Sequence, residues 1–222
     1  MAKEKTFVPR AVIFDMDGLM LDTERPALSS WIKAAGMLGW ELPEAVMLQT
    51  IGRDEESCRQ IVVDYCGPGF PYGKVWDVMQ KLTVEQADAE GLSHRPGLLV
   101  LLDHLSRLRL PLGVATSTVG EIARWKLEKA GILERFSVLV CGDEVKRGKP
   151  APDIFLLAAE RLGQTPQNCI GFEDSPAGLA ALHAAGIPSV FVKDLVEPPK
   201  EILCRVWRRY GDLSETVELF GS

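Results

Sequence analysis

The sequence predicts an α/β protein: a doubly wound parallel sheet that carries a helical insertion after its first strand. From Arg95 onward, short apolar runs alternate with helix-like segments, which is the pattern of β-α-β units. The short runs are apolar at successive positions, as expected when helices cover both faces of a parallel sheet. Residues from about Thr23 to His94 break this alternation and show only helical spacing.

The elements of the sheet are predicted in order along the chain. The first strand is Ala11-Val12-Ile13-Phe14. One helix ends at Gly131, and another opens with a proline in its first turn and ends at Gly163. The remaining strands are expected at 110–116, 138–141, 169–172 and 189–192, and the helices at 120–130, 152–162, 177–185 and, closing the chain, 201–220.

The insertion is predicted to be entirely helical. Apolar residues recur at helical spacing in 28–35, 57–65 and 75–82, and no convincing strand separates them. Hinges are expected at 21–24 and 93–97. The predicted organisation is therefore a core formed by 1–22 and 95–222, with a helical cap at 23–94.

Composition excludes several classes of function. The chain has 222 residues, 46% of them apolar, with a net charge of −6 and a pI near 5.2. This charge argues against nucleic-acid or anionic-membrane partners, and it means that a phosphate site needs local positive charge from a metal ion and a lysine. Five scattered cysteines without Cys-x-x-Cys spacing and a start without a signal peptide predict a cytoplasmic location. No apolar stretch reaches the roughly 18 residues of a membrane span.

Four motifs carry chemistry, and each is expected at the carboxyl end of a strand or before a helix, where ligands gather in open parallel sheets. Phe14-Asp15-Met16-Asp17-Gly18 closes the first strand, and Gly171-Phe172-Glu173-Asp174 closes a later one. The other two motifs are Ala115-Thr116-Ser117, which follows the second strand, and Lys149-Pro150, which precedes the helix expected at 152–162. The residues expected to form the site are Asp15, Asp17, Thr116, Ser117, Lys149, Glu173 and Asp174.

The residue types fit phosphoryl transfer. A carboxylate such as Asp15 can attack phosphorus and form an aspartyl-phosphate. Asp17 can protonate the leaving oxygen and then activate the water that cleaves the intermediate. Asp174 offers another oxygen ligand, and Glu173 adds one either directly or through water. Mg²⁺ is the cation expected for such a set of ligands.

Three further residues are expected to bind the transferring phosphoryl oxygens. Thr116 offers a hydroxyl, Ser117 a backbone N–H, and Lys149 a positive charge that also faces Asp15. Taken singly, each motif has a plain structural interpretation: Thr116 and Ser117 as helix N-caps, Asp174 as a capping acid, and Lys149 as an exposed lysine. Their joint occurrence in a consistent order favours the functional interpretation.

Three segments, 14–24, 148–155 and 171–178, resemble the haloacid dehalogenase superfamily, and within it the sugar-phosphatase and β-phosphoglucomutase-like branch. The resemblance implies a Rossmann-like core with a mobile helical cap. It also implies Asp15 as nucleophile and metal ligand, Asp17 as general acid/base and as metal ligand through its carbonyl, and Asp174 as metal ligand.

The expected reaction is hydrolysis of a small phosphomonoester, such as a sugar phosphate, by a Mg²⁺-dependent phosphatase. By resemblance, dehalogenases lack a carboxylic acid at the place of Asp17, which favours phosphoryl transfer. Mutases of the branch have a histidine shortly after the Asp-Thr of the first hinge, where this chain has Ala27. A β-phosphoglucomutase-type mutase and a non-catalytic protein that binds a phosphorylated ligand remain the alternatives.

The cap is expected to choose the substrate. Arg53 falls between two helical segments, where it can contact a second anionic or hydroxylated part of the substrate or pair with Glu55 or Glu56 on a helix surface. His94 is expected at the second hinge or at the entrance of the site. The predicted partner is a small phosphorylated metabolite, and the predicted state is a monomer or a weak homodimer.

Overall fold

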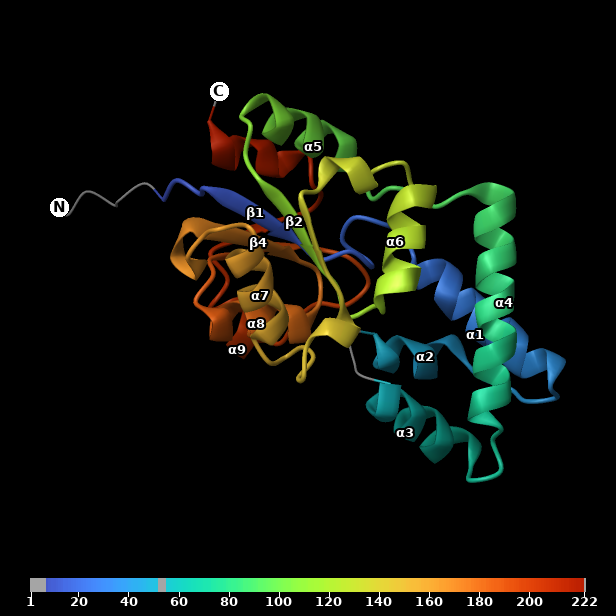
Figure 1. Ribbon diagram of the computed structural model, residues 1–222. Coiled ribbons are helices and arrows are strands. Elements are labelled where there is room, and N and C mark those ends of the chain that lie inside the picture. Colours follow the sequence, from blue (N-terminus) through green and yellow to red (C-terminus); the bar gives the residue numbers. More distant parts are fainter. Residues whose placement is uncertain (1–6, 52–54, 222) are drawn as a thin grey trace.

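The computed structural model describes residues 7–51 and 55–221, which form a six-stranded parallel sheet flanked by helices (Figure 1). The strand order is β3-β2-β1-β4-β5-β6, and every neighbouring pair is parallel. The predicted doubly wound α/β fold is confirmed. The strands are β1 (Ala11–Phe14), β2 (Leu112–Ala115), β3 (Val138–Val140), β4 (Cys169–Glu173), β5 (Ser189–Val192) and β6 (Arg208–Tyr210).

Strand β1 lies at the centre of the sheet, between β2 and β4. Phe14, its last residue, pairs with Val114 on one side and with Phe172 on the other. The chain runs outward from β1 through β2 to β3 and then crosses back to β4, so the winding direction reverses between β1 and β4. A ligand crevice is expected outside the carboxyl ends of the strands at such a reversal.

Helices cover both faces of the sheet (Figure 1). Neighbouring residues of β1 enter different cores: Ile13 packs with Phe155 and Leu182, whereas Phe14 belongs to the cluster on the other face. This explains why the strands are apolar at successive positions. The helices of the core are α5 (Leu98–Arg107), α6 (Gly120–Lys129), α7 (Asp153–Arg161), α8 (Pro176–Ala185) and α9 (Lys200–Leu203), with 3₁₀ turns η2 (Leu133–Arg135), η3 (Gly142–Glu144), η4 (Pro166–Asn168) and η5 (Glu215–Phe220).

The insertion is helical, as predicted, and lies beyond the carboxyl ends of the strands (Figure 1). Among its described residues no strand joins the sheet. It has a hydrophobic core of its own that includes Leu28, Trp31, Val62, Val75 and Met79. Its elements are α1 (Glu24–Met37), α2 (Glu44–Met47), η1 (Leu48–Thr50), α3 (Glu55–Cys66) and α4 (Tyr72–Glu90).

The two connections between core and insertion run side by side. Leu21 and His94 form an isolated antiparallel bridge, and the N–H of Arg95 donates to the carbonyl of Met20 at 2.8 Å. Both predicted hinge segments therefore meet at one place. We refer to residues 23–94 as the insert below; its limits as a domain remain a prediction.

The predicted closing helix over 201–220 is wrong. Residues 208–210 instead form β6, which pairs with β5 through Val190 and Arg208. An unpaired β5 would leave its backbone N–H and C=O groups without partners at the sheet edge, and β6 supplies them. Only the short α9 and the 3₁₀ helix η5 flank β6. Within the described residues, no helix combines the length and apolarity that crossing a membrane requires.

Candidate active site

Asp15 stands at the carboxyl end of the central strand. Its backbone N–H donates to the carbonyl of Phe172 at 3.0 Å, which continues the β1–β4 ladder by one residue and fixes where the side chain leaves the sheet. The side chain is 11% exposed and faces a cavity of about 690 Å³ between core and insert. The first motif thus puts a buried carboxylate at the floor of this cavity.

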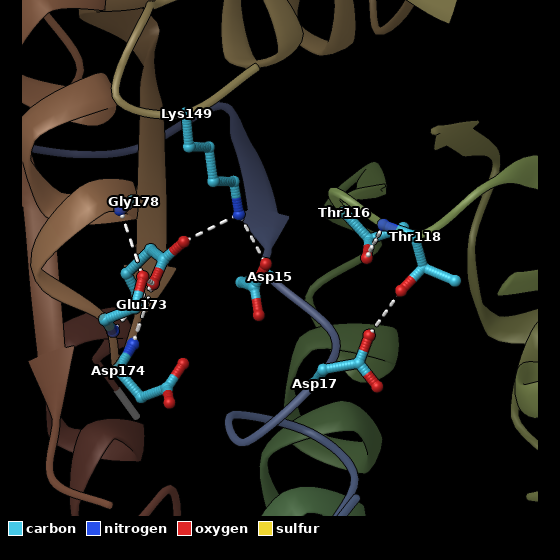
Figure 2. A network of polar contacts seen from close by, with 9 residues as sticks. Asp15, Asp17, Thr116, Thr118, Lys149, Glu173, Asp174 and Gly178 are labelled. Atoms are coloured by element: carbon cyan, nitrogen blue, oxygen red, sulfur yellow. Dashed lines mark hydrogen bonds and ion pairs between the residues drawn. The ribbon is translucent and has the colours of Figure 1, made fainter. Parts of the chain in front are cut away.

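Lys149 is buried between two carboxylates (Figure 2). Its Nζ donates to Asp15 Oδ1 and, at 2.7 Å, to Glu173 Oε1, and its side chain is only 6% exposed. Burial would lower the pKa of Lys149, but the charges of Asp15 and Glu173 outweigh burial and raise it. Lys149 is therefore a fixed cation inside the site and not an exposed lysine.

Glu173 is held in place by the start of α8. Its Oε2 accepts the backbone N–H groups of Asp174 (3.0 Å) and Ser175 (2.9 Å) and the Ser175 hydroxyl (3.0 Å). Ser175 in turn caps α8 by accepting the N–H of Gly178 at 3.0 Å (Figure 2). The cap of this helix is thus Ser175, which leaves the side chain of Asp174 available for another role.

The three carboxylates Asp15, Glu173 and Asp174 can each bring one oxygen within 4.8 Å of the others. Asp174 is 5% exposed, and its Oδ1 has no hydrogen-bond partner among the described residues. Burial, followed by the charges of Glu173 and Asp15, raises the pKa of Asp174 well above its usual range. A buried, unpartnered oxygen in an all-oxygen cluster fits a hard divalent cation such as Mg²⁺.

The same surroundings act on Asp15. Burial raises the pKa of Asp15 to about 8, and the charges of Glu173 and Asp17 add to that effect, although Lys149 opposes it. Since the carboxylate is the form that attacks phosphorus, Asp15 needs more positive charge nearby than Lys149 supplies. A divalent cation in the neighbouring cluster would supply it.

Asp17 is bound by a separate set of donors. Its Oδ1 accepts the Thr23 hydroxyl and the Lys126 ammonium, both at 2.6 Å. Its Oδ2 accepts the Thr118 hydroxyl at 2.7 Å, the contact of Asp17 drawn in Figure 2. Burial would raise the pKa of Asp17, but Lys126 and these hydroxyls lower it below its usual value. Thr23 occupies the N-cap position of α1 without capping it, because its hydroxyl goes to Asp17.

Thr116 and Ser117 follow β2 and line the same cavity. The side chain of Thr116 is buried, and its hydroxyl accepts the N–H of Thr118 at 3.1 Å. The N-cap residue of α6 is Val119, so neither Thr116 nor Ser117 caps that helix. Both remain available to a ligand in the cavity.

The structure thus brings together all the residues expected from the four motifs. Three residues contact Asp17 but were not identified as site residues from the sequence: Thr23, Thr118 and Lys126. Arg53 lies outside the described residues. His94 lies at the junction of core and insert, where its Nε2 is 2.9 Å from the carbonyl oxygen of Ala130, and it does not line the cavity.

Fold and site together define a class: α/β enzymes that gather carboxylates and a buried lysine at the carboxyl edge of a doubly wound sheet. A family model described as haloacid dehalogenase-like hydrolase matches residues 9–186. The chain belongs to the haloacid dehalogenase-like hydrolase family, and the resemblance stated from the motifs is confirmed.

Individual relatives support this assignment. The chain is 32% identical over 184 residues to the "Phosphorylated carbohydrates phosphatase" of Thermotoga maritima, covering 82% of this chain and 83% of that protein. It is 33% identical over 201 residues to "Hexitol phosphatase A" of Escherichia coli, covering 86% of each. Among solved structures, a putative β-phosphoglucomutase from Thermotoga maritima matches with a TM-score of 0.78 and 28% identity, over 95% of this chain and 97% of that one. The prediction of a phosphatase-type enzyme of this family is confirmed.

Proposed function

We propose that the protein hydrolyses a small phosphomonoester through an aspartyl-phosphate formed on Asp15, with Mg²⁺ as cofactor. The observation that carries this proposal is the placement of Asp15: a buried carboxylate at the cavity floor, bonded to Lys149 and adjacent to Glu173 and Asp174. That arrangement holds a nucleophile beside fixed positive charge and beside ligands for a cation.

The reaction would have two steps. An oxygen of Asp15 attacks phosphorus, the bond from phosphorus to the leaving oxygen breaks, and Asp17 gives that oxygen a proton. Asp17 then takes a proton from the water that attacks the aspartyl-phosphate, which releases phosphate and restores Asp15. Bonded to Lys126 and two hydroxyls, Asp17 is ionised in the present arrangement, which suits the second step. In the first step Asp17 must be protonated, and its carboxyl group must bond to the leaving oxygen in place of Lys126.

The other residues bind the phosphoryl group or a metal ion and so neutralise negative charge in the site. Lys149, the Thr116 hydroxyl and the Ser117 N–H would contact the phosphoryl oxygens. Asp15, Asp174 and the backbone carbonyl of Asp17 would hold Mg²⁺. Bound there, the cation offsets the repulsion between an anionic nucleophile and an anionic substrate and aligns the reacting atoms.

The substrate proposed from the relatives is a phosphorylated sugar or polyol, since the two proteins compared above are named for phosphorylated carbohydrates and hexitols. The mutase alternative is less well supported, because Ala27 lines the cavity and offers no group that transfers a proton. For the polypeptide itself we retain the expectation of a monomer or weak homodimer, which light scattering would test.

The test is phosphate release from a panel of phosphorylated sugars and polyols, with Mg²⁺ and with a chelator. We expect turnover only with the metal, and its loss in Asp15→Asn. Conversion of a hexose 1-phosphate to the 6-phosphate without phosphate release would establish the mutase instead. Tight binding without turnover by metal-loaded protein would establish the binding protein.

A further inference from the structure

The part of the cavity formed by the insert has an aromatic wall. Trp31 of α1 and Trp76 of α4 line it, with ring centroids 5.8 Å apart and an angle of 59° between the rings. Trp125 of α6 lines it from the core. Such a wall favours the apolar face of a ring or carbon chain.

The charges in this cavity are unbalanced. The described residues that line it include seven carboxylate side chains and only two cationic ones, both lysines. Lys149 is bonded to Asp15 and Glu173, and Lys126 is bonded to Asp17. Among the described lining residues, no cation therefore remains for a second anionic group on a ligand.

Carboxylate side chains also line the insert side of the cavity. Glu55 at the start of α3 and Glu90 at the end of α4 both line the cavity. An anionic group beside either carboxylate would face like charge, whereas a hydroxyl or ammonium group there would donate a hydrogen bond to it. The insert side of the cavity is thus suited to donors.

A smaller cavity of about 190 Å³ opens inside the insert and shares Trp31, Glu55 and Trp76 with the large one. Tyr72 lines it, is 5% exposed, and has an Oη without a hydrogen-bond partner among the described residues. Unpartnered buried hydroxyls are uncommon in proteins. A hydroxyl group of a bound ligand would supply the missing partner.

We propose that the insert selects substrates by the charge of the leaving group: it accepts neutral or cationic, hydroxyl-bearing groups and rejects groups with a second anion. Glu55, Glu90 and Tyr72 are the specificity-determining residues. This inference rests on the proposed phosphatase function and adds to it a rule for the substrate. Arg53 lies outside the described residues; of the alternatives given for it from the sequence, contact with a second anionic part of the substrate predicts the opposite order, whereas contact with a hydroxylated part or pairing with Glu55 or Glu56 does not.

The test compares three hexose derivatives of similar size and different charge: glucosamine 6-phosphate, glucose 6-phosphate and 6-phosphogluconate. Each is measured as a substrate and as a competitor of p-nitrophenyl phosphate hydrolysis in Mg²⁺. We expect 6-phosphogluconate, with its second anion, to be at least about tenfold weaker than glucose 6-phosphate both as a substrate and as a competitor. Glucosamine 6-phosphate, which carries an ammonium group, should equal or exceed glucose 6-phosphate in both measurements. Equal or reversed order overturns the inference while the phosphatase proposal stands. Absence of phosphate release from all of these compounds, p-nitrophenyl phosphate included, overturns the phosphatase proposal and the inference with it.

Single substitutions test which side chains cause the expected preference for the charge of the substrate. Glu55→Gln and Glu90→Gln should each reduce the difference in activity between 6-phosphogluconate and glucose 6-phosphate, which we call the gap. Glu85→Gln is the matched control, because Glu85 is an exposed residue of α4 that does not line the cavity, and it should leave the gap unchanged. Tyr72→Phe should raise KM for glucose 6-phosphate more than KM for p-nitrophenyl phosphate. An unchanged gap in both glutamate variants would remove these residues from selection.

Discussion

Two lysines each bind one of the two aspartates that follow β1. Lys149 reaches Asp15 from the loop before α7, and Lys126 reaches Asp17 from the middle of α6. Asp15, the proposed nucleophile, and Asp17, the proposed proton shuttle, are thus held by different lysines, although they are only two residues apart in sequence. Their pKa values are also displaced in opposite directions, upward for Asp15 by burial and downward for Asp17 by Lys126 against the effect of burial.

Replacing Asp17 tests its role as the proton shuttle. Asp17→Asn should reduce kcat for a sugar phosphate by about 10²- to 10⁴-fold, the usual contribution of a general acid or base. The loss in the first step should be smaller with p-nitrophenyl phosphate, because its leaving group is a stable anion that needs no proton. Rapid-mixing measurements of nitrophenol release would separate this step from hydrolysis of the intermediate.

The matched variant is Asp15→Asn, which should abolish the first step for both substrates. If Asp17→Asn slowed nitrophenol release as much as it slowed sugar-phosphate cleavage, Asp17 would not be acting as a proton donor. Its contribution would then be to the geometry of the loop after β1.

The site was predictable where its residues directly follow strands. Asp15, Thr116 and Asp174 could be assigned because the carboxyl ends of parallel strands share one edge. Lys126 could not, because it lies in the interior of a helix and contacts Asp17 only because the fold places α6 beside the loop that follows β1. No local spacing in the sequence encodes that contact.

At the scale of elements, the start of α8 is fitted closely to Glu173. A Cβ added to Gly178 would lie 1.6 Å from Glu173 Oε1. The helix can approach the end of β4 this closely only with glycine at that position. The close approach keeps the Glu173 carboxylate between Lys149 and the first turn of the helix.

Gly178→Ala should therefore disturb both stability and activity. We expect a loss of about 1–3 kcal/mol in the free energy of unfolding, the range typical of overpacking, measured by chemical denaturation. Activity should fall as well, because Glu173 must move away from Lys149. The control is Gly73→Ala, at a helical glycine of α4 whose added Cβ meets nothing within 4 Å, and it should be neutral or slightly stabilising. Equal stability of the two variants would contradict the close-packing argument.

The elements were predictable where local signals in the sequence mark their limits. Strand β5 and helices α6, α7 and α8 match their predicted limits within one residue or so, because apolar runs and glycine or proline signals mark them. Strand β6 was missed because its residues, Arg208-Arg209-Tyr210, are largely exposed at the sheet edge. Their pairing with β5 depends on backbone hydrogen bonds, which leave no pattern of apolar residues.

For the whole molecule, the acidic site opposes folding when no metal is bound. Burial raises the pKa of Asp15 to about 8 and that of Glu24 to about 7, and it raises the pKa of Asp174 as well. These groups bind more protons in the folded than in the unfolded chain between about pH 4 and pH 8, so stability falls as pH rises through that window. Asp17 has a lowered pKa, so its favourable contribution to stability is present throughout that window and is lost only at a lower pH.

Thermal unfolding would measure this effect. In a chelator, Tm should be lower at pH 8 than at pH 5.5. Mg²⁺ should raise Tm more at pH 8, because a ligand that binds only the folded state stabilises it and the carboxylates are then ionised. Asp174→Asn should flatten the pH dependence and weaken the response to Mg²⁺. A metal-free Tm that rises from pH 5.5 to pH 8 would contradict the assignment of buried, neutral acids.

The bridge between Leu21 and His94 has a consequence for how such a chain can diversify. Because the outgoing and returning segments meet at one point, we predict that the intervening seventy or so residues behave as a module joined to the core by a single stem. A different module grafted onto that stem would leave the sheet, and with it Asp15 and Lys149, undisturbed. Transplanting this module into a relative should therefore carry substrate preference with it, while the chemistry of bond breaking stays with the recipient.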